Sequence, residues 1–320
     1  MIPLTDLSLQ WPEIVRFRSR VEERFRPPPP DCILLLPCSR RKPYSASRSH
    51  RLFSRVTSGP RRRMRIQEIV VTSPLGAVPR QLEAVPPARN YDIPVTGIWS
   101  EEELEVVSAS LARVISNCSE GQVPVLAHVT GGYREACRRA EERLGWGFEY
   151  TSPESPTSDA SLKSLDQALS RIEGEGRRTS QIEQVREVLA YQYGREAADR
   201  MTAQPASVKR ERGYRRIVSE GKDVARENPS TGLFTPEEEG ARVLSELGLY
   251  CVDVDFDLKT KILYSPGVVS ADHSIRPGDE VVVRRGGRPV GEGTAVLCGR
   301  EMERSGRGRA VVLRRIFQAL

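Results

Sequence analysis

The sequence predicts an α/β layered core, a small helical domain and a C-terminal β-barrel, in that order along its 320 residues. Three observations lead to this prediction. Short apolar runs, typical of strands buried on both faces, alternate with amphipathic helical patterns in the first half of the chain. Helical patterns continue through the middle. The last quarter changes to the two-residue period of strands, with glycine turns between them.

The first half contains three candidate central strands. An amphipathic segment from Trp11 to Phe25 comes first and ends before four consecutive prolines, which cannot continue a helix. The three apolar runs are residues 32–36, 68–72 and 123–129, and helical patterns cover residues 104–115 and 133–144. This order predicts an α/β core over residues 1–160, with parallel-type strands and a site beyond their carboxyl ends.

The middle and the end of the chain differ in period. Residues 161–247 follow a polar linker and are expected to form a helical domain, with a turn at 228–232 and a new helix beginning at Thr235, Pro236 and Glu237. Residues 248–320 contain short alternating strands separated by glycine turns, for which a small β-barrel is the natural solution.

Positive charge is concentrated at the two ends of the chain. The net charge is +6, from 49 Lys and Arg against 43 Asp and Glu, and residues 1–65 alone carry 15 basic and 5 acidic side chains. Such a split favours a polyanionic partner, because basic side chains release counterions from a phosphate backbone. A solvated, arginine-rich surface without a partner explains the charge equally well.

Composition argues against several classes of protein. No apolar run approaches the roughly 18 residues of a membrane helix, and the N-terminus lacks the pattern of a secretory signal or a transit peptide. A cytoplasmic location without a membrane partner is therefore expected. The six cysteines are far apart and none are spaced as CxxC, so neither a disulfide framework nor a metal site is indicated, and no cofactor is expected.

The C-terminal segment carries four glycine-containing strings, at residues 265–268, 275–281, 290–295 and 306–311. Together they resemble the PUA domain of tRNA- and rRNA-modifying enzymes. The resemblance implies RNA binding, in which glycines let the backbone approach phosphates and arginines make bidentate contacts. A glycine-rich barrel with another use is the alternative. The candidate RNA-binding residues are Arg276, Arg284, Arg285, Arg288, Arg307 and Arg309.

The candidate catalytic residues follow the first apolar run, where Cys38 lies close to Arg40, Arg41 and Lys42 in the sequence. Cationic neighbours favour the thiolate, which is the nucleophilic form of cysteine. The alternative is a small cysteine buried in a turn, with basic neighbours that only contact phosphate. A single histidine such as His50 is more often structural than a general base.

Three strings in the core resemble the archaeosine synthase family, a paralogue of archaeal tRNA-guanine transglycosylase: residues 37–44 with the pattern PCSxxKPY, residues 73–80 and residues 91–97. Residues 182–247 resemble the domain that precedes PUA in the same proteins. The resemblance implies attachment of the side-chain amine of free lysine to the nitrile of 7-cyano-7-deazaguanine, at position 15 of the tRNA D-loop. The product is an amidine, on which a separate radical enzyme acts.

The resemblance has two further implications. The α/β core is expected, by analogy alone, to be related to uracil-DNA glycosylase folds. Full-length members of the family begin with a transglycosylase-like barrel that carries a zinc site, so this chain resembles a split form. A separate transglycosylase-like subunit is accordingly an expected partner, beside the tRNA that carries 7-cyano-7-deazaguanine.

Resemblance and residue chemistry together suggest a set of site residues. Cys38 is the candidate nucleophile, Lys42 and Tyr44 are candidates for stabilising charge on nitrogen, and His50 and Asp92 for orienting or deprotonating the amine. Direct attack by lysine on the nitrile is the rival mechanism. The candidate substrate-binding residues are Ser39, Pro43, Ser45, Ser73, Pro74, Leu75, Gly76, Arg80, Thr96 and Gly97.

Two other classes of function stay open on the sequence. A non-catalytic subunit that presents tRNA to another enzyme would carry an unreactive Cys38. A base-excising or base-exchanging glycosylase would need a pocket for a flipped base and a carboxylate near the sugar, for which Asp92 is the candidate.

Overall fold

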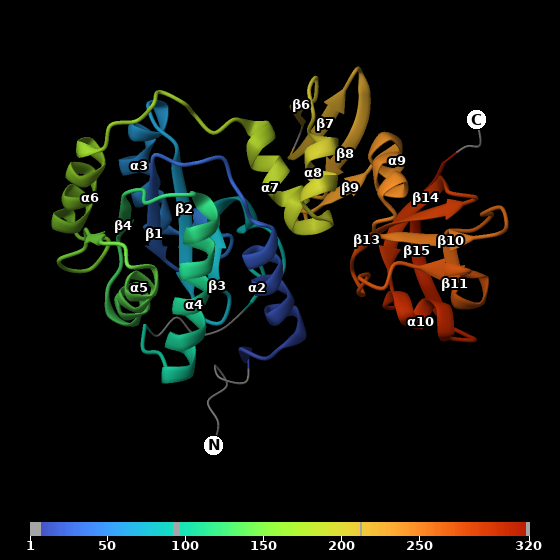
Figure 1. Ribbon diagram of the computed structural model, residues 1–320, viewed down its shortest axis with the longest axis horizontal. Helices are drawn as coiled ribbons and strands as arrows, with labels where there is room; N and C mark the ends of the chain where they lie inside the picture. The colour runs from blue at the N-terminus through green and yellow to red at the C-terminus, as the bar shows by residue number, and fades with distance from the viewer. Residues whose placement is uncertain (1–7, 92–96, 212, 318–320) are drawn as a thin grey trace. The chain divides into compact units, whose positions relative to one another are not determined.

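The structure, a computed structural model, describes residues 8–91, 97–211 and 213–317 (Figure 1). The chain divides into two compact units, one that runs to Glu187 and one that begins at Val188. Each unit has its own sheets and its own buried core. In the part of the chain that the structure describes, no helix has both the length and the apolar composition needed to cross a membrane.

The first unit is built on a five-stranded sheet with the order β3-β2-β1-β4-β5. Its central strand β1 pairs in parallel with β2 and β4, β5 continues the parallel set, and β3 is an antiparallel edge strand. The three strands predicted from apolar runs are confirmed, whereas β3 and β5 add to the prediction. The strands are β1 (Cys32–Pro37), β2 (Ile66–Thr72), β3 (Gly76–Pro79), β4 (Val125–Ala127) and β5 (Phe148–Tyr150).

Helices cover both faces of this sheet. On one face, α3 (Arg48–Ser58) and α6 (Asp159–Arg171) pack on alternate residues of β1, in a buried cluster that includes Leu34, Phe53 and Leu165. On the other face, α2 (Pro12–Arg24) and α4 (Glu101–Cys118) contact β3, and α5 (Gly131–Leu144) packs along α4 (Figure 1). The predicted layered α/β core is thus confirmed.

Helix α4 shows how local sequence sets an element boundary. The Ser100 side chain accepts a hydrogen bond from the Glu103 amide, and the Glu103 carboxylate accepts one from the Ser100 amide. This capping box satisfies two amide groups that the first turn of a helix leaves without partners. Helix α5 ends at Gly145, whose left-handed conformation favours glycine. The predicted helical patterns of residues 104–115 and 133–144 both lie inside observed helices.

The expected helical domain over residues 161–247 is corrected by the structure. The helices α6, α7 (Gln181–Tyr193), α8 (Arg195–Met201) and α9 (Glu238–Leu247) are present. Between α8 and α9 in the sequence, however, the chain forms a four-stranded antiparallel sheet. The sheet is hidden in the sequence because charged side chains fill its exposed positions. Helix α9 also begins at Glu238 rather than at Thr235, because that residue belongs to β9. The strands are β6 (Ser207–Glu211), β7 (Tyr214–Ser219), β8 (Lys222–Glu227) and β9 (Phe234–Pro236).

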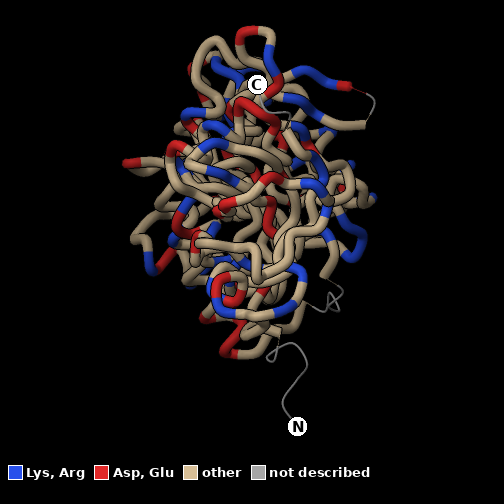
Figure 2. The backbone as a smooth tube through the Cα atoms, turned by 90° about the vertical axis from the view of Figure 1, so that its right-hand side faces the viewer, with Lys and Arg blue, Asp and Glu red and all other residues tan. Residues whose placement is uncertain are grey.

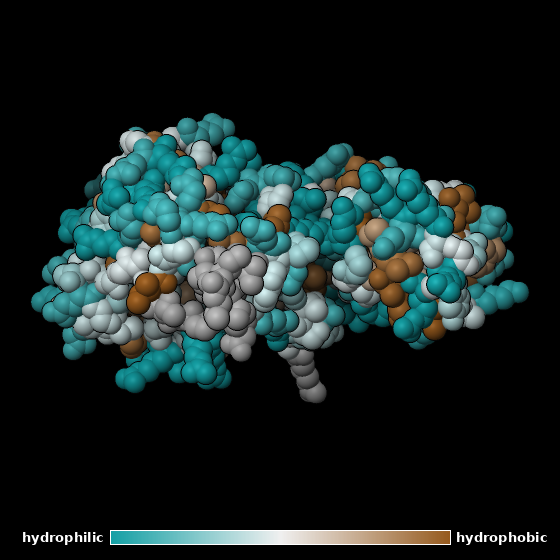
Figure 3. Space-filling model, turned by 90° about the horizontal axis from the view of Figure 1, so that it is seen from below, coloured by the Kyte–Doolittle hydropathy of each residue, from teal (hydrophilic) through white to brown (hydrophobic). Residues whose placement is uncertain are grey.

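The C-terminal β-rich prediction is confirmed as a six-stranded sheet with the order β11-β15-β14-β13-β10-β12. A short helix, α10 (Gly299–Arg304), lies between the last two strands in the sequence. The strands are β10 (Cys251–Val254), β11 (Ile262–Tyr264), β12 (Ser270–Ala271), β13 (Glu280–Arg285), β14 (Arg288–Ala295) and β15 (Arg309–Ile316). Figure 3 shows a largely hydrophilic face with separate hydrophobic patches.

Candidate active site

The first unit has a topological switch point between its neighbouring parallel strands β1 and β4. The chain leaves β1 toward α3 on one face of the sheet and leaves β4 toward α5 on the other face. Loops that diverge in this way open a crevice beyond the carboxyl ends of the strands, where α/β proteins bind their ligands. Cys38 follows β1 directly, and Tyr133 stands in the first turn of α5.

Cys38 and Tyr133 meet at this switch point. The Cys38 Sγ lies 3.0 Å from the Tyr133 hydroxyl, and the thiol is half-buried. Burial, and after it the neighbouring Cys38, raises the pKa of Tyr133, so its hydroxyl keeps its proton at neutral pH. Tyr133 is therefore equipped to donate a hydrogen bond to a thiolate or to an atom that gains charge beside it.

Close backbone packing fixes the start of α5. The Gly132 amide donates a hydrogen bond of 2.9 Å to the Gly97 carbonyl oxygen. A Cβ atom at position 132 would come within 2.7 Å of that oxygen, so only glycine permits this approach. The Trp99 ring, two residues further on, meets the Tyr133 ring edge to face with 4.7 Å between centroids. Tyr133 is thus held from two sides.

Lys42 lies among aromatic rings on the same loop as Cys38. Its Nζ donates a hydrogen bond to the Ser39 carbonyl oxygen and lies 4.8 Å from the centre of the Tyr44 ring and 4.2 Å from that of Tyr91. The two tyrosine hydroxyls are 2.9 Å apart, and Tyr91 also contacts Thr72. Burial raises the pKa of both tyrosines. The ammonium therefore faces neutral ring faces, not phenolates.

His50 is fully buried and both of its ring nitrogens are engaged. Its Nδ1 accepts a hydrogen bond of 2.9 Å from an Arg80 amine, because a guanidinium can only donate. The proton must then be on Nε2, which donates to the Pro37 carbonyl oxygen at 2.9 Å. Burial, and next the Arg80 charge, lowers the pKa of His50 to about 3. The imidazole is neutral and anchors the residue before Cys38.

Arg80 is held in turn by two carboxylates. It donates to Glu68 at 2.7 Å and to Glu83 at 2.8 Å, and Glu83 also accepts from the Ser45 amide. Burial opposes ionisation of Glu68, but the charges of Arg80 and Arg61 more than offset it, so the pKa of this carboxyl lies below its ordinary value. A chain of contacts from Glu68 through Arg80 and His50 therefore supports the Cys38 loop.

The turn after β2 contains four predicted substrate-binding residues, and each is engaged in the fold. The Ser73 hydroxyl donates to Glu103, the Pro74 carbonyl oxygen accepts from Arg18, and Leu75 is fully buried. Gly76 has a φ of +76°, and a Cβ atom there would meet the Ser110 hydroxyl oxygen at 2.4 Å. These residues build the turn beside the site, and their contact with substrate stays a prediction.

The other predicted site residues divide between the loop and the segment after it. Ser39 donates its hydroxyl proton to the Arg41 carbonyl oxygen, Pro43 is half-buried, and Ser45 is exposed. Gly97 lies against the start of α5. Asp92 and Thr96 lie outside the described residues, so their predicted roles have no structural counterpart here.

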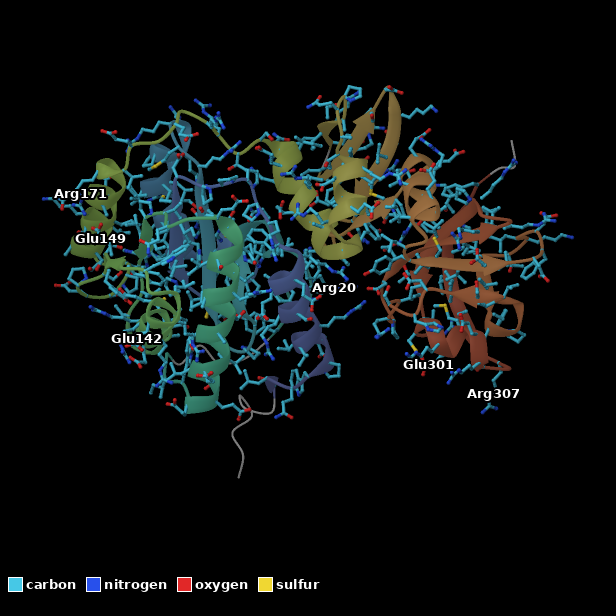
Figure 4. The ribbon with its side chains drawn as sticks, viewed as in Figure 1. Arg20, Glu142, Glu149, Arg171, Glu301 and Arg307 are labelled. Carbon is cyan, nitrogen blue, oxygen red and sulfur yellow. The ribbon has the colours of Figure 1, made fainter. Side chains whose placement is uncertain are left out.

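The predicted RNA-binding arginines of the second unit are not equivalent. Arg284 is turned into its own domain, where it donates to both oxygens of Asp253 and to the Ser245 carbonyl oxygen. Arg307 lies at the same end of the domain as Glu301 (Figure 4). Figure 2 shows basic and acidic residues interspersed along the backbone. The exposed members of the set are Arg276, Arg285, Arg288, Arg307 and Arg309.

One open pocket of about 500 Å³ lies in this domain, lined by His273, Arg276, Cys298, Arg300 and Glu301. Of the six predicted arginines, only Arg276 lines it. The pocket and the exposed arginines together give the domain several cationic positions that suit phosphate oxygens.

Sequence reasoning missed Tyr133, Trp99 and Glu68. A signal existed for Tyr133, because it follows the glycine pair that closes the third apolar run. The carboxyl ends of adjacent parallel strands lie at one edge of a sheet, so this turn had to face the Cys38 loop. No sequence signal joined Glu68 to His50, since the link runs through Arg80 in three dimensions.

Three protein families match successive parts of the chain. Residues 14–169 match a domain of unknown function, DUF5591. Residues 183–248 match the patch-forming domain C2 of tRNA-guanine transglycosylase, and residues 254–317 match the PUA domain. The predicted PUA domain is confirmed by this match, and the segment before it is of the transglycosylase type.

Curated relatives match across the same domains. Archaeosine synthase subunit alpha of Methanosarcina acetivorans is 37% identical over 98% of this chain and 51% of its own length. Archaeosine synthase of Haloferax volcanii is 34% identical over 97% of this chain and 52% of its own length. The crystal structure of AF0587, a protein of unknown function, superimposes with a TM-score of 0.75 and 32% identity, covering 95% of this chain and 100% of the other.

The alignments cover 97% or 98% of this chain and therefore include the α/β core, the C2 domain and the PUA domain. The chain spans about half the length of the curated relatives that it matches. Over 97% or 98% of its length, the chain is therefore similar to archaeosine synthases of several archaea.

Proposed function

We propose that this chain attaches lysine, through its side-chain amine, to the nitrile of 7-cyano-7-deazaguanine at position 15 of a tRNA, in archaeosine biosynthesis. The observation that carries the proposal is the contact of 3.0 Å between the Cys38 Sγ and the Tyr133 hydroxyl, at the switch point of the sheet. A nucleophile beside a proton donor is what addition to a carbon–nitrogen triple bond requires.

In the first step, the Cys38 thiolate attacks the nitrile carbon. One carbon–sulfur bond forms, one π bond of the nitrile breaks, and its electron pair moves to nitrogen. Tyr133 is within reach of the sulfur and supplies a proton to that nitrogen, which leaves a neutral thioimidate. As the Tyr133 proton moves to nitrogen, the Cys38 thiol proton moves to the tyrosine oxygen across the same contact, so sulfur attacks as a thiolate and the net change is addition of S–H across one π bond.

In the second step, the neutral lysine amine attacks the thioimidate carbon. A carbon–nitrogen bond forms, the carbon–sulfur bond breaks, and Cys38 leaves as a thiolate. The product is an amidine that contains all atoms of lysine and of the nitrile. An aliphatic amine has an ordinary pKa near 10.4, so a base must accept one of its protons before attack. Asp92 remains the candidate for that base, and Lys42 and Tyr44 remain candidates for stabilising charge on nitrogen.

His50 has another role in this mechanism. Because its two ring nitrogens are used by Arg80 and by the Pro37 carbonyl oxygen, it has no free lone pair with which to accept a substrate proton. We assign it as a positioning residue that fixes the backbone before Cys38. Burial, and next the charge of Arg80, lowers the pKa of His50 and keeps the imidazole neutral.

The second unit supplies the RNA contacts in this proposal. Its two domains match the patch-forming domain C2 of tRNA-guanine transglycosylase and the PUA domain, and this similarity supports a role in RNA binding. Exposed arginines such as Arg307 and Arg309 are the candidates for phosphate contacts. A transglycosylase-like subunit, and a radical enzyme that acts on the lysine adduct, are the expected partners in the cytoplasm.

The test is mass spectrometry of nucleosides from nitrile-bearing tRNA after incubation with the purified chain and lysine. We expect a mass gain equal to one lysine on the modified base. Release of a free base instead would favour a glycosylase. No change of the tRNA, with retained tRNA binding, would favour a non-catalytic tRNA-binding subunit.

A further inference from the structure

A long stretch of the first unit is entirely without acidic residues. Between Asp31 and Glu68 the sequence contains nine arginines and one lysine but no aspartate or glutamate. The stretch includes β1, the Cys38 loop and α3. Part of this charge is used inside the fold: Lys42 donates to the Ser39 carbonyl oxygen, and Arg61, Arg63 and Arg65 pair with acidic side chains or with carbonyl oxygens.

Helix α3 presents a row of arginines to solvent. Arg48, Arg51 and Arg55 are all exposed, whereas His50 and Phe53 face the core. At 100° per residue the three arginines lie within an arc of about 60°, and at 1.5 Å per residue they extend over about 10 Å of the helix. The α3 arginine face, meaning these three residues, is therefore one continuous cationic surface.

Among the described residues, these arginines have no acidic partner. Neither an ion pair nor a hydrogen bond joins the side chains of Arg48, Arg51 and Arg55 to any residue that the structure describes. The contrast is with α5, also in the first unit, where Arg138 and Arg139 form ion pairs with Glu135, Glu142 and Glu101. Arginine side chains that form no ion pair and no hydrogen bond with the described residues can bind an external anion.

The face begins next to the candidate active site. Helix α3 starts at the carboxyl-end edge of the sheet, and His50 in its first turn donates to the Pro37 carbonyl oxygen, one residue before Cys38. Arg40 and Arg41, also exposed, stand in the loop between Cys38 and the helix. A chain of phosphates that enters at the loop would meet cationic side chains continuously along α3.

We propose that the α3 arginine face binds the phosphate backbone of the RNA substrate and so presents the target base to Cys38. The inference rests on the proposed function for the identity of that RNA as tRNA. The binding is electrostatic and independent of sequence, because arginines that contact phosphates position an RNA without reading its bases. It acts in addition to the contacts of the second unit.

The experiment compares two triple variants of the whole chain, R48Q/R51Q/R55Q and R138Q/R139Q/R143Q. Both remove three positive charges from one exposed helix of the first unit, but the second removes arginines that are paired with glutamates. Binding of an unmodified tRNA transcript is measured by fluorescence anisotropy at several salt concentrations. Thermal melts establish that each variant is folded.

For R48Q/R51Q/R55Q we expect the affinity for tRNA to fall roughly tenfold or more near 0.1 M salt. The slope of log affinity against log salt concentration should decrease in magnitude by about 2 to 3. The α5 variant should keep both values close to those of the parent chain. Unchanged affinity and slope in the α3 variant would overturn the inference, as would an equal loss in both variants.

The outcome is separable from that of the proposed function. If the parent chain binds tRNA through the α3 arginine face but incorporates no lysine, the activity fails and the binding surface stands. If the α3 variant keeps its tRNA affinity while it loses binding to an acidic partner protein, the surface belongs to that protein and this inference fails.

Discussion

Replacing His50 by glutamine tests the assignment of this residue as a positioning group. Glutamine has a donor and an acceptor at its end, so it can donate to the Pro37 carbonyl oxygen and accept from Arg80, as the neutral imidazole does. It does not titrate. The substitution therefore keeps the two contacts in kind and removes only the proton-binding group.

The magnitude follows from the pKa of His50, which is lowered from 6.5 to about 3 in the folded chain. At pH values between these two pKa values, the unfolded chain binds a proton at His50 and the folded chain does not. The contribution of His50 to the free energy of unfolding is therefore fully present above pH 6.5 and is lost as the pH falls toward 3. Each pH unit is worth about 1.4 kcal/mol. From pH 7 to pH 5 the parent chain should lose about 2 kcal/mol through His50.

The assay is urea unfolding at pH 7, 6 and 5, followed by tryptophan fluorescence. All three tryptophans, Trp11, Trp99 and Trp146, belong to the first unit and report on its unfolding. The free energy of unfolding of His50→Gln should not show this decrease of about 2 kcal/mol between pH 7 and pH 5. The variant should therefore become more stable relative to the parent as the pH is lowered. Both chains still contain His128, whose pKa is also lowered by burial, so its contribution cancels in the comparison.

Activity gives the second measurement on the same variant. We expect lysine incorporation by His50→Gln to stay within about tenfold of the parent, since general acid or base groups contribute typically about 10²- to 10⁴-fold. A loss of about 10³-fold in a variant that unfolds at the same urea concentration would refute the positioning role. So would an identical pH dependence of stability in the two chains.

Two further substitutions test the geometry around the site. Tyr133→Phe removes the hydroxyl that contacts the Cys38 Sγ, and we expect a rate about 10- to 100-fold lower from the loss of a charge-assisted hydrogen bond worth roughly 1.5–3 kcal/mol; an unchanged rate in single-turnover assays would exclude Tyr133 from the reaction. Gly76→Ala places a Cβ 2.4 Å from the Ser110 hydroxyl oxygen at a φ of +76°, so we expect about 2 kcal/mol or more of destabilisation in urea. A urea midpoint of unfolding equal to that of the parent would show that the turn accommodates the added Cβ atom without loss of stability.

The central strands were predictable because burial on both faces demands uninterrupted apolar residues. Strand β1 has five of its six residues buried, and the pattern is plain in the sequence. Strands β3 and β5 were not predictable, because they contain only four and three residues and lack a distinct period. The sheet of β6 to β9 was mistaken for helix because its exposed positions carry charged side chains, such as Lys209 and Arg210.

The candidate site was predictable in part. The position of Cys38 after a buried strand placed it at the correct edge of the sheet. Its partner Tyr133 is 95 residues away in the chain, and only the order of the strands brings the two together. The inward role of Arg284 was equally hidden, because its pairing with Asp253 depends on the register of β10 and β13. Tertiary contacts of this kind leave no local pattern.

The most direct test of the central claim is a trapping experiment with nitrile-bearing tRNA in the absence of lysine. If Cys38 forms a thioimidate, the parent chain should become covalently linked to the tRNA on a denaturing gel, and added lysine should release the protein and leave the amidine on the RNA. Cys38→Ser should form no adduct and should lose lysine incorporation by about 10³-fold or more. Near-normal incorporation by Cys38→Ser would contradict the covalent mechanism and leave direct attack by lysine.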